Sequence, residues 1–370
     1  MKRVLISVTN DLATDQRVDK VARSLQKFGY DVKLIGRQLP DSLPLGREYP
    51  CHRMKLLFRR GPLFYAEYNV RLMLLLLFKR ADILLSNDLD TLLANFLVSR
   101  MKGCPLVYDS HEYYTEVPEL VSRKRVQNIW RRIERWIFPR LKHVYTVNES
   151  IAAIYRDQYN VPVRVIRNLP ETESVQKIMS REELGLPEDR FVLILQGAGI
   201  NIDRGAEELI EAMVHLPESF LAIVGSGDVI EILKSRSREL ALADRVVFHP
   251  KMPYGEMMQY TLNADLGVTL DKDTNLNYRY SLPNKIFDYM KAGIPVLSSN
   301  LPELRKVIEE FDIGSVVESH EPKAIAEAVE KIRNNPELHR QWAENTKFAT
   351  ARLNWQKQEA ELAAIFREVG

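Results

Sequence analysis

The segment with the clearest chemistry lies at 280–299, where Pro283 is followed by Asn284, Lys285 and Asp288. Asn284 and Asp288 are four residues apart, so in a helix they share one face. A helix start presents free N–H groups and a partial positive charge, which together with Lys285 could hold a diphosphate. Asp288, one turn along, could accept hydrogen bonds from both hydroxyls of a ribose. A well-capped helix with a surface lysine is the alternative.

Two glycine-rich corners follow apolar runs in the second half of the chain. The first contains Gly197 and Gly199, and the second contains Gly225 and Gly227. Glycine allows a backbone to approach a ligand closely, and Arg204, just beyond the first corner, could pair with a phosphate. The alternative for each corner is an ordinary turn, with Arg204 as a solvated side chain.

A polar corner also follows the first apolar run of the chain, where Asn10 and Asp11 precede Asp15 and Arg17. It lacks the Gly-x-Gly-x-x-Gly spacing of a dinucleotide site, which argues against a nicotinamide enzyme. The corner could offer N–H groups and a guanidinium to a ligand. It could equally be a polar loop in which Asp15 caps the next helix.

His111 and Glu112 follow the apolar run at 105–110. They lack the second histidine of a zinc-protease helix, and the chain has no Asp-x-Asp at a strand end, so we expect no metal site. A structural histidine is the alternative interpretation of His111.

Both halves alternate short apolar runs with amphipathic stretches. This pattern predicts an α/β fold in which helices cover both faces of a parallel sheet, and near-continuous Val, Ile and Leu suit strands buried on both sides. The expected strands are 3–8, 31–36, 81–87, 105–110 and 143–148 in the first half, and 190–197, 220–227, 245–251, 264–270 and 294–299 in the second.

The chain is therefore expected to form two doubly wound, Rossmann-like domains that face a central cleft. The segment 163–176 changes from apolar to polar around Pro170 and reads as the linker. We place one domain at 1–168 and the other at 169–345. Residues 346–370 form a final helical stretch that could cross back to the first domain.

Composition narrows the class of protein. Of 370 residues, 45% are hydrophobic and 28% are charged, which excludes a disordered or low-complexity chain. The two cysteines exclude a disulfide scaffold and suit a reducing compartment. The N-terminal run reads as a strand and not as a signal peptide, and no apolar run approaches the roughly 20 residues of a spanning helix. We expect a soluble, cytoplasmic protein.

The net charge of +2 conceals an uneven distribution. Residues 1–170 carry a balance of +12 and residues 171–370 a balance of −10. Basic residues interleave with bulky apolar ones at 53–80 and 123–142, a pattern typical of a helix on an anionic membrane, or of a solvated face over a core. We expect peripheral membrane contact and no nucleic-acid partner.

The run from Tyr280 to Ser299 resembles the nucleotide-binding signature of family 4 glycosyltransferases, which are retaining enzymes of the GT-B fold. The glycine corners, the segment 264–266, the N-terminal segment 15–18 and the segment 107–113 are similar to other motifs of that family, so the resemblance covers nearly the whole chain. It points to a bacterial-type enzyme of a subgroup with Pro-Asn-Lys.

The resemblance implies that the domain at 1–168 binds the acceptor and that the domain at 169–345 binds the nucleotide sugar. It also implies a role for each site residue. Arg204 and Lys285 would bind the diphosphate, Asp288 the ribose, and His111 would lie near the donor sugar; the three basic residues are the expected catalytic groups. The nucleotide-sugar site would also include Gly197, Gly199, Gly225, Gly227, Asn284 and Asn10. The acceptor site would consist of Asp11, Arg17 and Glu112. No cofactor or metal is implied.

The implied reaction moves a sugar from a UDP- or GDP-linked donor to a glycan or lipid-linked acceptor, as in cell-surface polysaccharide synthesis. Two positions depart from the family pattern: Tyr280 replaces the usual first glutamate, and Ala198 or Gly199 the usual arginine. An inactive GT-B-like scaffold subunit and a sugar-nucleotide epimerase of the same fold are the alternatives.

Overall fold

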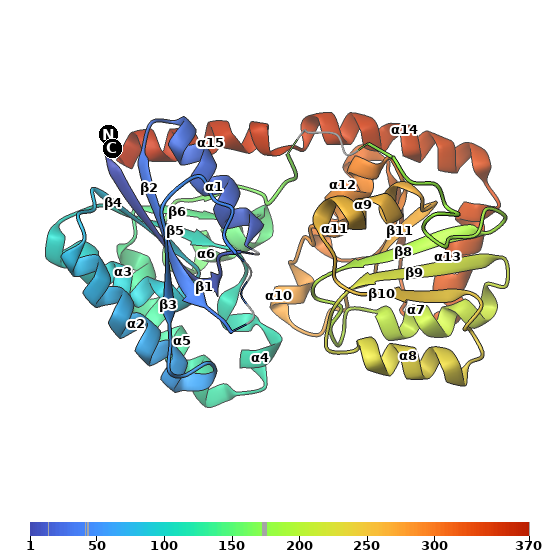
Figure 1. Ribbon diagram of the computed structural model, residues 1–370, viewed down its shortest axis with the longest axis horizontal. Helices are drawn as coiled ribbons and strands as arrows, with labels where there is room; N and C mark the ends of the chain where they lie inside the picture. The colour runs from blue at the N-terminus through green and yellow to red at the C-terminus, as the bar shows by residue number, and fades with distance from the viewer. Residues whose placement is uncertain (14, 41, 43, 172–175, 370) are drawn as a thin grey trace. The chain divides into compact units, whose positions relative to one another are not determined.

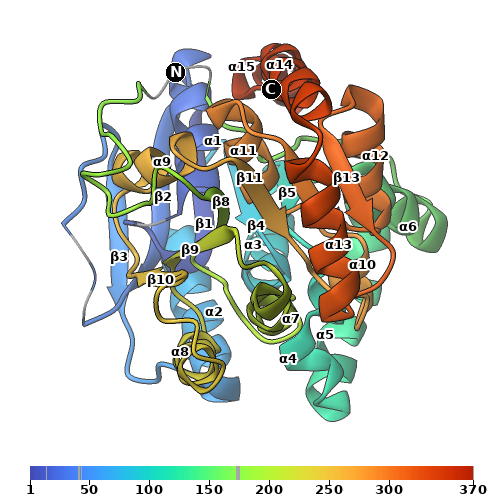
Figure 2. The same ribbon diagram turned by 90° about the vertical axis from the view of Figure 1, so that its right-hand side faces the viewer.

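The computed structural model describes residues 1–13, 15–40, 42, 44–171 and 176–369, which divide into two compact units. Unit 1 contains Met1–Asn168 and Lys357–Gly370, and unit 2 contains Leu169–Gln356. Each unit is built on one parallel sheet with helices on both faces (Figures 1 and 2), which confirms the expected fold of two Rossmann-like domains.

The sheet of unit 1 has seven parallel strands in the order β3-β2-β1-β4-β5-β6-β7. The strands are β1 (Arg3–Asp11), β2 (Asp31–Gln38), β3 (Cys51–Lys55), β4 (Ile83–Asn87), β5 (Leu106–Ser110), β6 (His143–Thr146) and β7 (Val163–Val165). The helices of this unit are α1 (Gln16–Lys27), α2 (Gly61–Phe78), α3 (Leu89–Lys102), α4 (Pro118–Val121), α5 (Lys124–Ile137), α6 (Glu149–Tyr159) and α15 (Trp355–Val369). Helices α1 and α15 lie on one face, and α2, α3 and α5 lie on the other (Figure 1).

The sheet of unit 2 has six parallel strands in the order β10-β9-β8-β11-β12-β13. They are β8 (Phe191–Gly197), β9 (Ser219–Gly225), β10 (Val246–His249), β11 (Leu266–Thr269), β12 (Val296–Ser299) and β13 (Gly314–Val317). The helices are α7 (Ala206–Ala212), α8 (Ile230–Glu239), α9 (Tyr254–Leu262), α10 (Leu276–Arg279), α11 (Lys285–Ala292), α12 (Pro302–Phe311), α13 (Pro322–Arg333) and α14 (Pro336–Arg352).

Strand β8 shows why its nearly continuous apolar run is needed. Leu193 and Leu195 pack into a core with residues of α7 and α13, whereas Val192 and Ile194 pack into a second core with residues of α11 and α12. Side chains alternate between the faces of a strand, and both faces of this sheet are covered by helices. The buried sheet then fixes where its carboxyl-end loops begin.

The structure differs from the expected elements at the edges of both sheets. Strands β3 and β13 were not expected, because each is a short, partly exposed edge strand without a long apolar run. The expected linker 163–176 begins with β7, which pairs with β6, so its first part belongs to unit 1. Residues 172–175 of that linker lie outside the described residues.

The C-terminal stretch forms two helices instead of one. The expected boundary at 345/346 falls inside α14, which belongs to unit 2, and the chain joins unit 1 from Lys357 onward. Helix α15 is attached to unit 1 by hydrogen bonds from Ser24 Oγ to Glu359 Oε1 at 2.8 Å and from Tyr30 Oη to the Phe366 carbonyl at 3.0 Å.

None of the helices in the described part of the chain is long and apolar enough to cross a membrane. The two basic stretches take different forms. In the stretch 53–80, Arg53 and Lys55 lie on β3, and the bulky apolar residues belong mainly to α2. The stretch 123–142 is mostly helix α5, which is strongly amphipathic and buries Trp130 and Ile137.

Candidate functional site

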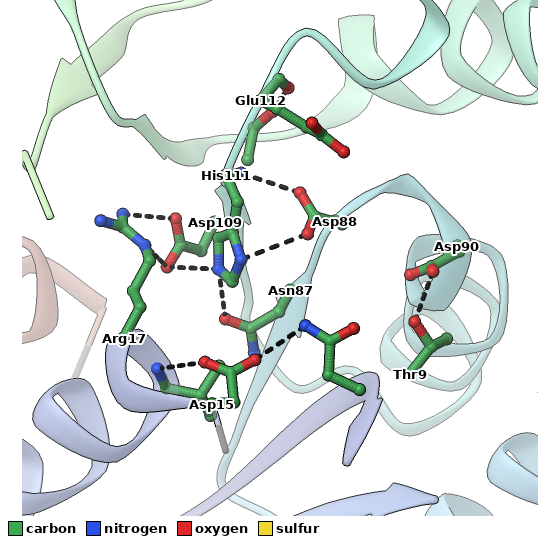
Figure 3. A network of polar contacts seen from close by, with 12 residues as sticks. Thr9, Asp15, Arg17, Asn87, Asp88, Asp90, Asp109, His111 and Glu112 are labelled. Carbon is green, nitrogen blue, oxygen red and sulfur yellow. Dashed lines mark hydrogen bonds and ion pairs between the residues drawn. The ribbon is translucent and has the colours of Figure 1, made fainter. Parts of the chain in front are cut away.

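The polar corner after β1 is organised by Asp15, which caps α1. Its Oδ1 accepts a hydrogen bond from the Val18 N–H at 3.0 Å, and its Oδ2 accepts one from Nδ2 of Asn10 at 2.9 Å (Figure 3). Asp11 accepts a hydrogen bond from the Ser42 hydroxyl at 2.6 Å. Asn10 and Asp11 therefore hold the loop, as the capping interpretation expects, and Asn10 also remains exposed.

Arg17 is buried and bound to Asp109 at the end of β5. Its Nε and Nη2 lie 3.1 and 2.7 Å from the two carboxylate oxygens, and its Nη1 donates to the carbonyl of Ile166 at 3.0 Å. The side chains are 3% and 0% exposed. Arg17 therefore holds the Asp109 carboxylate in place. Its burial gives no support to the contact with an acceptor that the sequence predicts.

His111 is enclosed by three acceptors (Figure 3). Nδ1 lies 3.2 Å from Oδ2 of Asp88, and Nε2 lies 3.2 Å from Oδ2 of Asp109 and 3.1 Å from Oδ1 of Asn87. Nδ2 of Asn87 donates to the carbonyl of Ser7 at 2.9 Å, which turns the amide oxygen toward the imidazole. Both ring nitrogens therefore face acceptors, and this arrangement is satisfied only when both carry protons.

The electrostatics agree with a protonated ring. Burial alone lowers the pKa of His111, but Asp88 and Asp109 outweigh it and raise this pKa to about 9. Burial also acts to raise the pKa of Asp109, yet Arg17 and His111 hold it down at about 2. For Asp88 burial dominates and raises the pKa to about 7. At neutral pH His111 is thus an imidazolium.

Asp88 sits on an unusual backbone. Its φ of 57° lies in the left-handed region, which costs a non-glycine residue about 1–3 kcal/mol. The main-chain N–H of Asp88 donates to the Asp109 carbonyl at 2.8 Å, and its Oδ1 accepts from the His111 N–H at 2.8 Å. Glu112 follows, and its carbonyl accepts from Ser110 Oγ at 2.9 Å. Asp88 is thus bound to the loop that carries His111 by its main chain and its side chain.

In unit 2 the two glycine corners are packed against each other. The Ser226 N–H donates to the Gly197 carbonyl at 3.0 Å, and the Ile200 N–H donates to the Ser226 carbonyl at 3.0 Å. A Cβ on Gly225 would lie 1.8 Å from the Gly197 oxygen, and one on Gly227 would lie 1.8 Å from the Ile200 oxygen. Packing alone therefore requires these two glycines.

Gly199 differs from its neighbours, because a Cβ built there meets no atom within 4 Å. Of the expected glycines in these corners, Gly199 is the one that faces open space. Gly205, just before α7, has a φ of 72° and approaches the Leu270 carbonyl so closely that a Cβ would lie 2.2 Å from its oxygen. That contact ties the start of α7 to the end of β11.

Arg204 is held at this point by a buried acid that sequence reasoning missed. Its Nη1 lies 2.9 Å from Oδ1 of Asp271, which is 0% exposed, and its guanidinium lies 4.3 Å from the centroid of the Tyr278 ring. Nε of Arg204 is buried without a hydrogen-bond partner among the described residues. The guanidinium is fixed, and one donor remains unused.

Lys285 begins helix α11 close to this group. Burial lowers its pKa, with Asp271 opposing that shift and Arg204 adding to it. Within the described part of the chain, the Lys285 ammonium has no hydrogen-bond or ion-pair partner. Arg204 and Lys285 together therefore bring two cations to one buried carboxylate, so the group has an excess positive charge.

Asp288 lies one turn further along α11 and is oriented from two neighbouring elements. Nε2 of Gln196 donates to Oδ2 at 3.1 Å, and the Tyr254 hydroxyl donates to Oδ1 at 2.9 Å. Asn284, the residue before the helix, is exposed. The structure thus places Asp288 beside the end of β8, where the first glycine corner begins.

The expected residues form one group in each unit. In unit 1, Asn10, Asp11, Arg17, His111 and Glu112 lie at the carboxyl ends of β1 and β5. In unit 2, the glycines, Arg204, Asn284, Lys285 and Asp288 lie around the ends of β8, β9 and β11. Sequence reasoning missed the residues that hold these side chains in place, namely Asn87, Asp88 and Asp271. Each is a polar residue at or just after the end of an apolar run, and that was the one signal that could have identified it.

Tyr280, at the position where the family pattern has a glutamate, ends the short helix α10 and is half-buried. No cluster of three or more His, Cys, Asp or Glu side chains suited to a metal ion occurs within the described ranges.

Comparison with known families finds two matching models, one for each half of the chain. Residues 15–173 match the model described as Glycosyltransferase Family 4, and residues 176–348 match the one described as Glycosyl transferases group 1. Among relatives, the alpha-D-kanosaminyltransferase of Streptomyces kanamyceticus is 25% identical over 292 residues, which are 74% of this chain and 73% of that one.

The match to other relatives is shorter. The D-inositol 3-phosphate glycosyltransferase of Xylanimonas cellulosilytica is 21% identical over 202 residues, 53% of this chain and 47% of that protein. The phosphatidyl-myo-inositol mannosyltransferase of Mycobacterium leprae is 22% identical over 214 residues, 54% of this chain and 53% of that protein. The chain spans about half the length of both relatives.

Solved structures share the fold over the full chain. Sucrose-phosphate synthase from Thermosynechococcus elongatus has a TM-score of 0.79 at 16% identity, covering 100% of this chain and 99% of that one. Anabaena HepE in complex with UDP and glucose has a TM-score of 0.75 at 15% identity, covering 100% of both chains. The chain thus joins a family 4-like and a group 1 glycosyltransferase domain in one protein of the GT-B type.

Proposed function

We propose that the protein transfers a sugar, with retention of anomeric configuration, from a nucleoside diphosphate sugar to a glycan or lipid-linked acceptor. We assign donor binding to unit 2 and acceptor binding to unit 1. The proposal includes membership of the Pro-Asn-Lys subgroup and a bacterial role in cell-surface polysaccharide synthesis. It rests above all on the placement of Arg204 and Lys285 around Asp271, with Asp288 one turn away.

The diphosphate and the ribose of a nucleoside diphosphate each have suitable partners in unit 2. The unused Nε–H of Arg204 and the ammonium of Lys285 suit phosphate oxygens, and Gly199 leaves room for a ligand beside the first corner. Asp288 is an acceptor-only carboxylate already oriented by Gln196 and Tyr254, which suits it to ribose hydroxyls. Asn284 and the start of α11 lie beside Lys285.

The chemistry requires that negative charge be stabilised on the departing diphosphate. The bond from the anomeric carbon to the diphosphate oxygen breaks while the acceptor oxygen bonds to that carbon, and the acceptor hydroxyl proton passes to a phosphate oxygen. Arg204 and Lys285 stabilise the charge that develops, which is electrostatic catalysis. His111, as an imidazolium, has no lone pair to take the proton, so we give it a role beside the donor sugar. No step in this scheme uses a metal or a cofactor.

Features of unit 1 support the proposed acceptor and the proposed location. Its basic balance and the amphipathic helix α5 support peripheral binding to an anionic membrane on the cytoplasmic side. Asp11 and Glu112 remain the proposed acceptor contacts. Relatives named for inositol phosphate and phosphatidylinositol support an acceptor that carries phosphate.

For the base of the donor, UDP is the first choice and GDP the second, because UDP is named with the similar Anabaena structure. Tyr280 favours the alternative of an inactive scaffold, since no glutamate stands at that position. The epimerase alternative is supported by likeness of fold alone, to a putative UDP-N-acetylglucosamine 2-epimerase from Listeria monocytogenes with a TM-score of 0.64.

The test is binding of UDP, GDP, ADP and CMP, measured by thermal shift and calorimetry. We expect one nucleoside diphosphate to stabilise the protein, with affinity reduced roughly tenfold or more in Asp288→Asn and Lys285→Gln. Lys306→Gln, an exposed substitution on α12, is the matched control. If none of the nucleotides stabilises the protein, the donor-binding proposal is wrong and the inactive scaffold is the better interpretation. NMR of the product made from the bound donor then decides between retention, inversion and epimerisation.

A further inference from the structure

A pocket of about 290 Å³ lies in unit 1, apart from the group around His111. It is formed at the carboxyl ends of β2 and β3 and beside the first turn of α2. Arg37 and Gln38 end β2, Lys55 ends β3, and Gln38 lies opposite Lys55 in the sheet. Ligands of doubly wound domains bind at this end of the strands, so the position suits a binding site.

The pocket is lined by three cations, Arg37, Lys55 and Arg59, and no acid is found among its described lining residues. Within the described chain none of the three has an ion-pair partner, and Nε of Arg37 is buried without a hydrogen bond. The carboxylate of Glu67 on α2 is already bound, by the Leu57 and Phe58 N–H groups at 2.9–3.0 Å and by Arg71 at 2.7 Å. The buried Asp90 also interacts electrostatically with Arg37, without an ion-pair contact. Three cations thus face one more distant carboxylate, and the pocket keeps an excess of positive charge.

One wall of the pocket is apolar. The Arg37 guanidinium lies 5.1 Å from the centroid of the buried Phe64 ring, which fixes its plane, and Leu56 and Phe58 add further apolar surface. A ligand that satisfies both parts carries a multiply charged anion next to a carbon skeleton. A phosphate monoester or diphosphate matches three cations better than a single carboxylate does, because it brings about two negative charges and more acceptor oxygens.

We propose that this pocket binds the phosphate or diphosphate group of the sugar acceptor. The inference rests on the proposed function, because it assigns the acceptor to unit 1. A structural connection supports it: the Ser42 hydroxyl donates to Asp11 at 2.6 Å and accepts from the Leu39 N–H at 2.7 Å. The pocket wall at Leu39 is thereby joined to the corner of β1 that carries Asp11.

The test is calorimetric titration of the full chain with phenyl phosphate, benzoate and benzyl alcohol. We expect phenyl phosphate to bind best, and Arg37→Gln and the exposed Arg59→Gln each to weaken it roughly tenfold. Arg100→Gln, an exposed substitution on α3 outside the pocket, is the matched control and should bind as wild type. Equal affinity in Arg37→Gln, Arg59→Gln and Arg100→Gln would overturn the proposal, as would benzoate binding as tightly as phenyl phosphate.

Two further arms separate the sources of phosphate and the two proposals. Glucose 1-phosphate represents a free acceptor, and vesicles with phosphatidic acid represent a lipid-linked acceptor. The probe whose binding is lost in Arg37→Gln identifies which of the two carries the phosphate group that the pocket binds. UDP titrated in parallel should bind equally to wild type and Arg37→Gln and more weakly to Arg204→Gln. If UDP fails to bind at all, the donor assignment falls while the pocket result stands.

Discussion

The amide oxygen of Asn87 lies 3.1 Å from Nε2 of His111 and cannot be exchanged for the amide nitrogen, because Nδ2 donates to the Ser7 carbonyl. With Asp88 at the other ring nitrogen, the imidazole is surrounded by acceptors. A neutral histidine would leave one nitrogen lone pair facing an oxygen. The charge of His111 is therefore set by its surroundings.

The first prediction concerns stability at alkaline pH. The pKa of His111 is raised to about 9, above its ordinary value near 6.5, so the stabilisation is fully present below pH 6.5 and is lost as pH rises through 9. Asp109 and Arg17 stay charged from pH 7 to 9, and Asp88, whose pKa is about 7, completes its ionisation early in this range. Burial raises the pKa of many tyrosines, Tyr49 and Tyr254 among them, and their titration lowers stability near pH 10, so the measurement stops at pH 9. Urea unfolding of wild type from pH 7 to 9 should show a decline on the order of 2 kcal/mol.

His111→Gln is the comparison for that measurement. It should show a much flatter profile over the same range, and nitrogen-15 NMR of wild type at pH 7 should show both ring nitrogens protonated. Parallel pH profiles for the two proteins would contradict the assignment.

The second prediction concerns the buried pair of Arg17 and Asp109. Arg17→Met should destabilise the protein by about 3–5 kcal/mol, because Asp109 would remain buried without its guanidinium. Arg23→Met on the same helix removes a more exposed pair with Asp19 and should cost about 1 kcal/mol or less. Chemical denaturation measures both. A similar loss of unfolding free energy in the two variants would show that the buried pair contributes no more to stability than the exposed one.

The third prediction separates the glycines of the first and second corners. Gly225→Ala should lower the melting temperature strongly, since the new methyl would lie 1.8 Å from the Gly197 oxygen and the φ of 142° disfavours a side chain. Gly199→Ala should fold normally, because nothing lies within 4 Å of the new Cβ. If Gly199 adjoins the diphosphate, its variant should weaken nucleotide binding without losing stability. A stable Gly225→Ala would contradict the packing argument.

The fourth prediction concerns membrane binding. The full chain should sediment with anionic vesicles at low salt through unit 1, and binding should fall as salt rises, because the Debye length shortens to about 8 Å at physiological ionic strength. Neutralising Arg132 and Arg135 on α5 to Gln should weaken binding by roughly 1 kcal/mol per residue. Failure to bind anionic vesicles at low salt would favour a soluble acceptor.

Both parallel sheets could be predicted from the sequence, because β4 begins with three apolar residues and β8 and β9 are nearly continuous apolar runs, which a sheet covered on both faces can bury. Edge strands were missed for the opposite reason. Strand β3 reads Cys-His-Arg-Met-Lys, with a single fully buried residue, and only its pairing with β2 makes it a strand.

For the candidate site, residue types at strand ends were informative, but their partners were not. Nothing in the sequence near Arg17 indicates Asp109, which is 92 positions away and reaches it because β1 and β5 lie in one sheet. The same holds for Gln196 and Asp288. Long-range contacts of this kind depend on the order of strands, which local patterns do not encode.

Helix α15 has a consequence for how the protein is made. Unit 1 is built from two segments, Met1–Asn168 and Lys357–Gly370, with all of unit 2 between them. During synthesis on the ribosome, Ser24 and Tyr30 must therefore wait for Glu359 and Phe366, which emerge after unit 2 is complete. Unit 1 begins before unit 2 and is completed after it, so nascent chains carry an uncovered patch of α1 until α15 emerges.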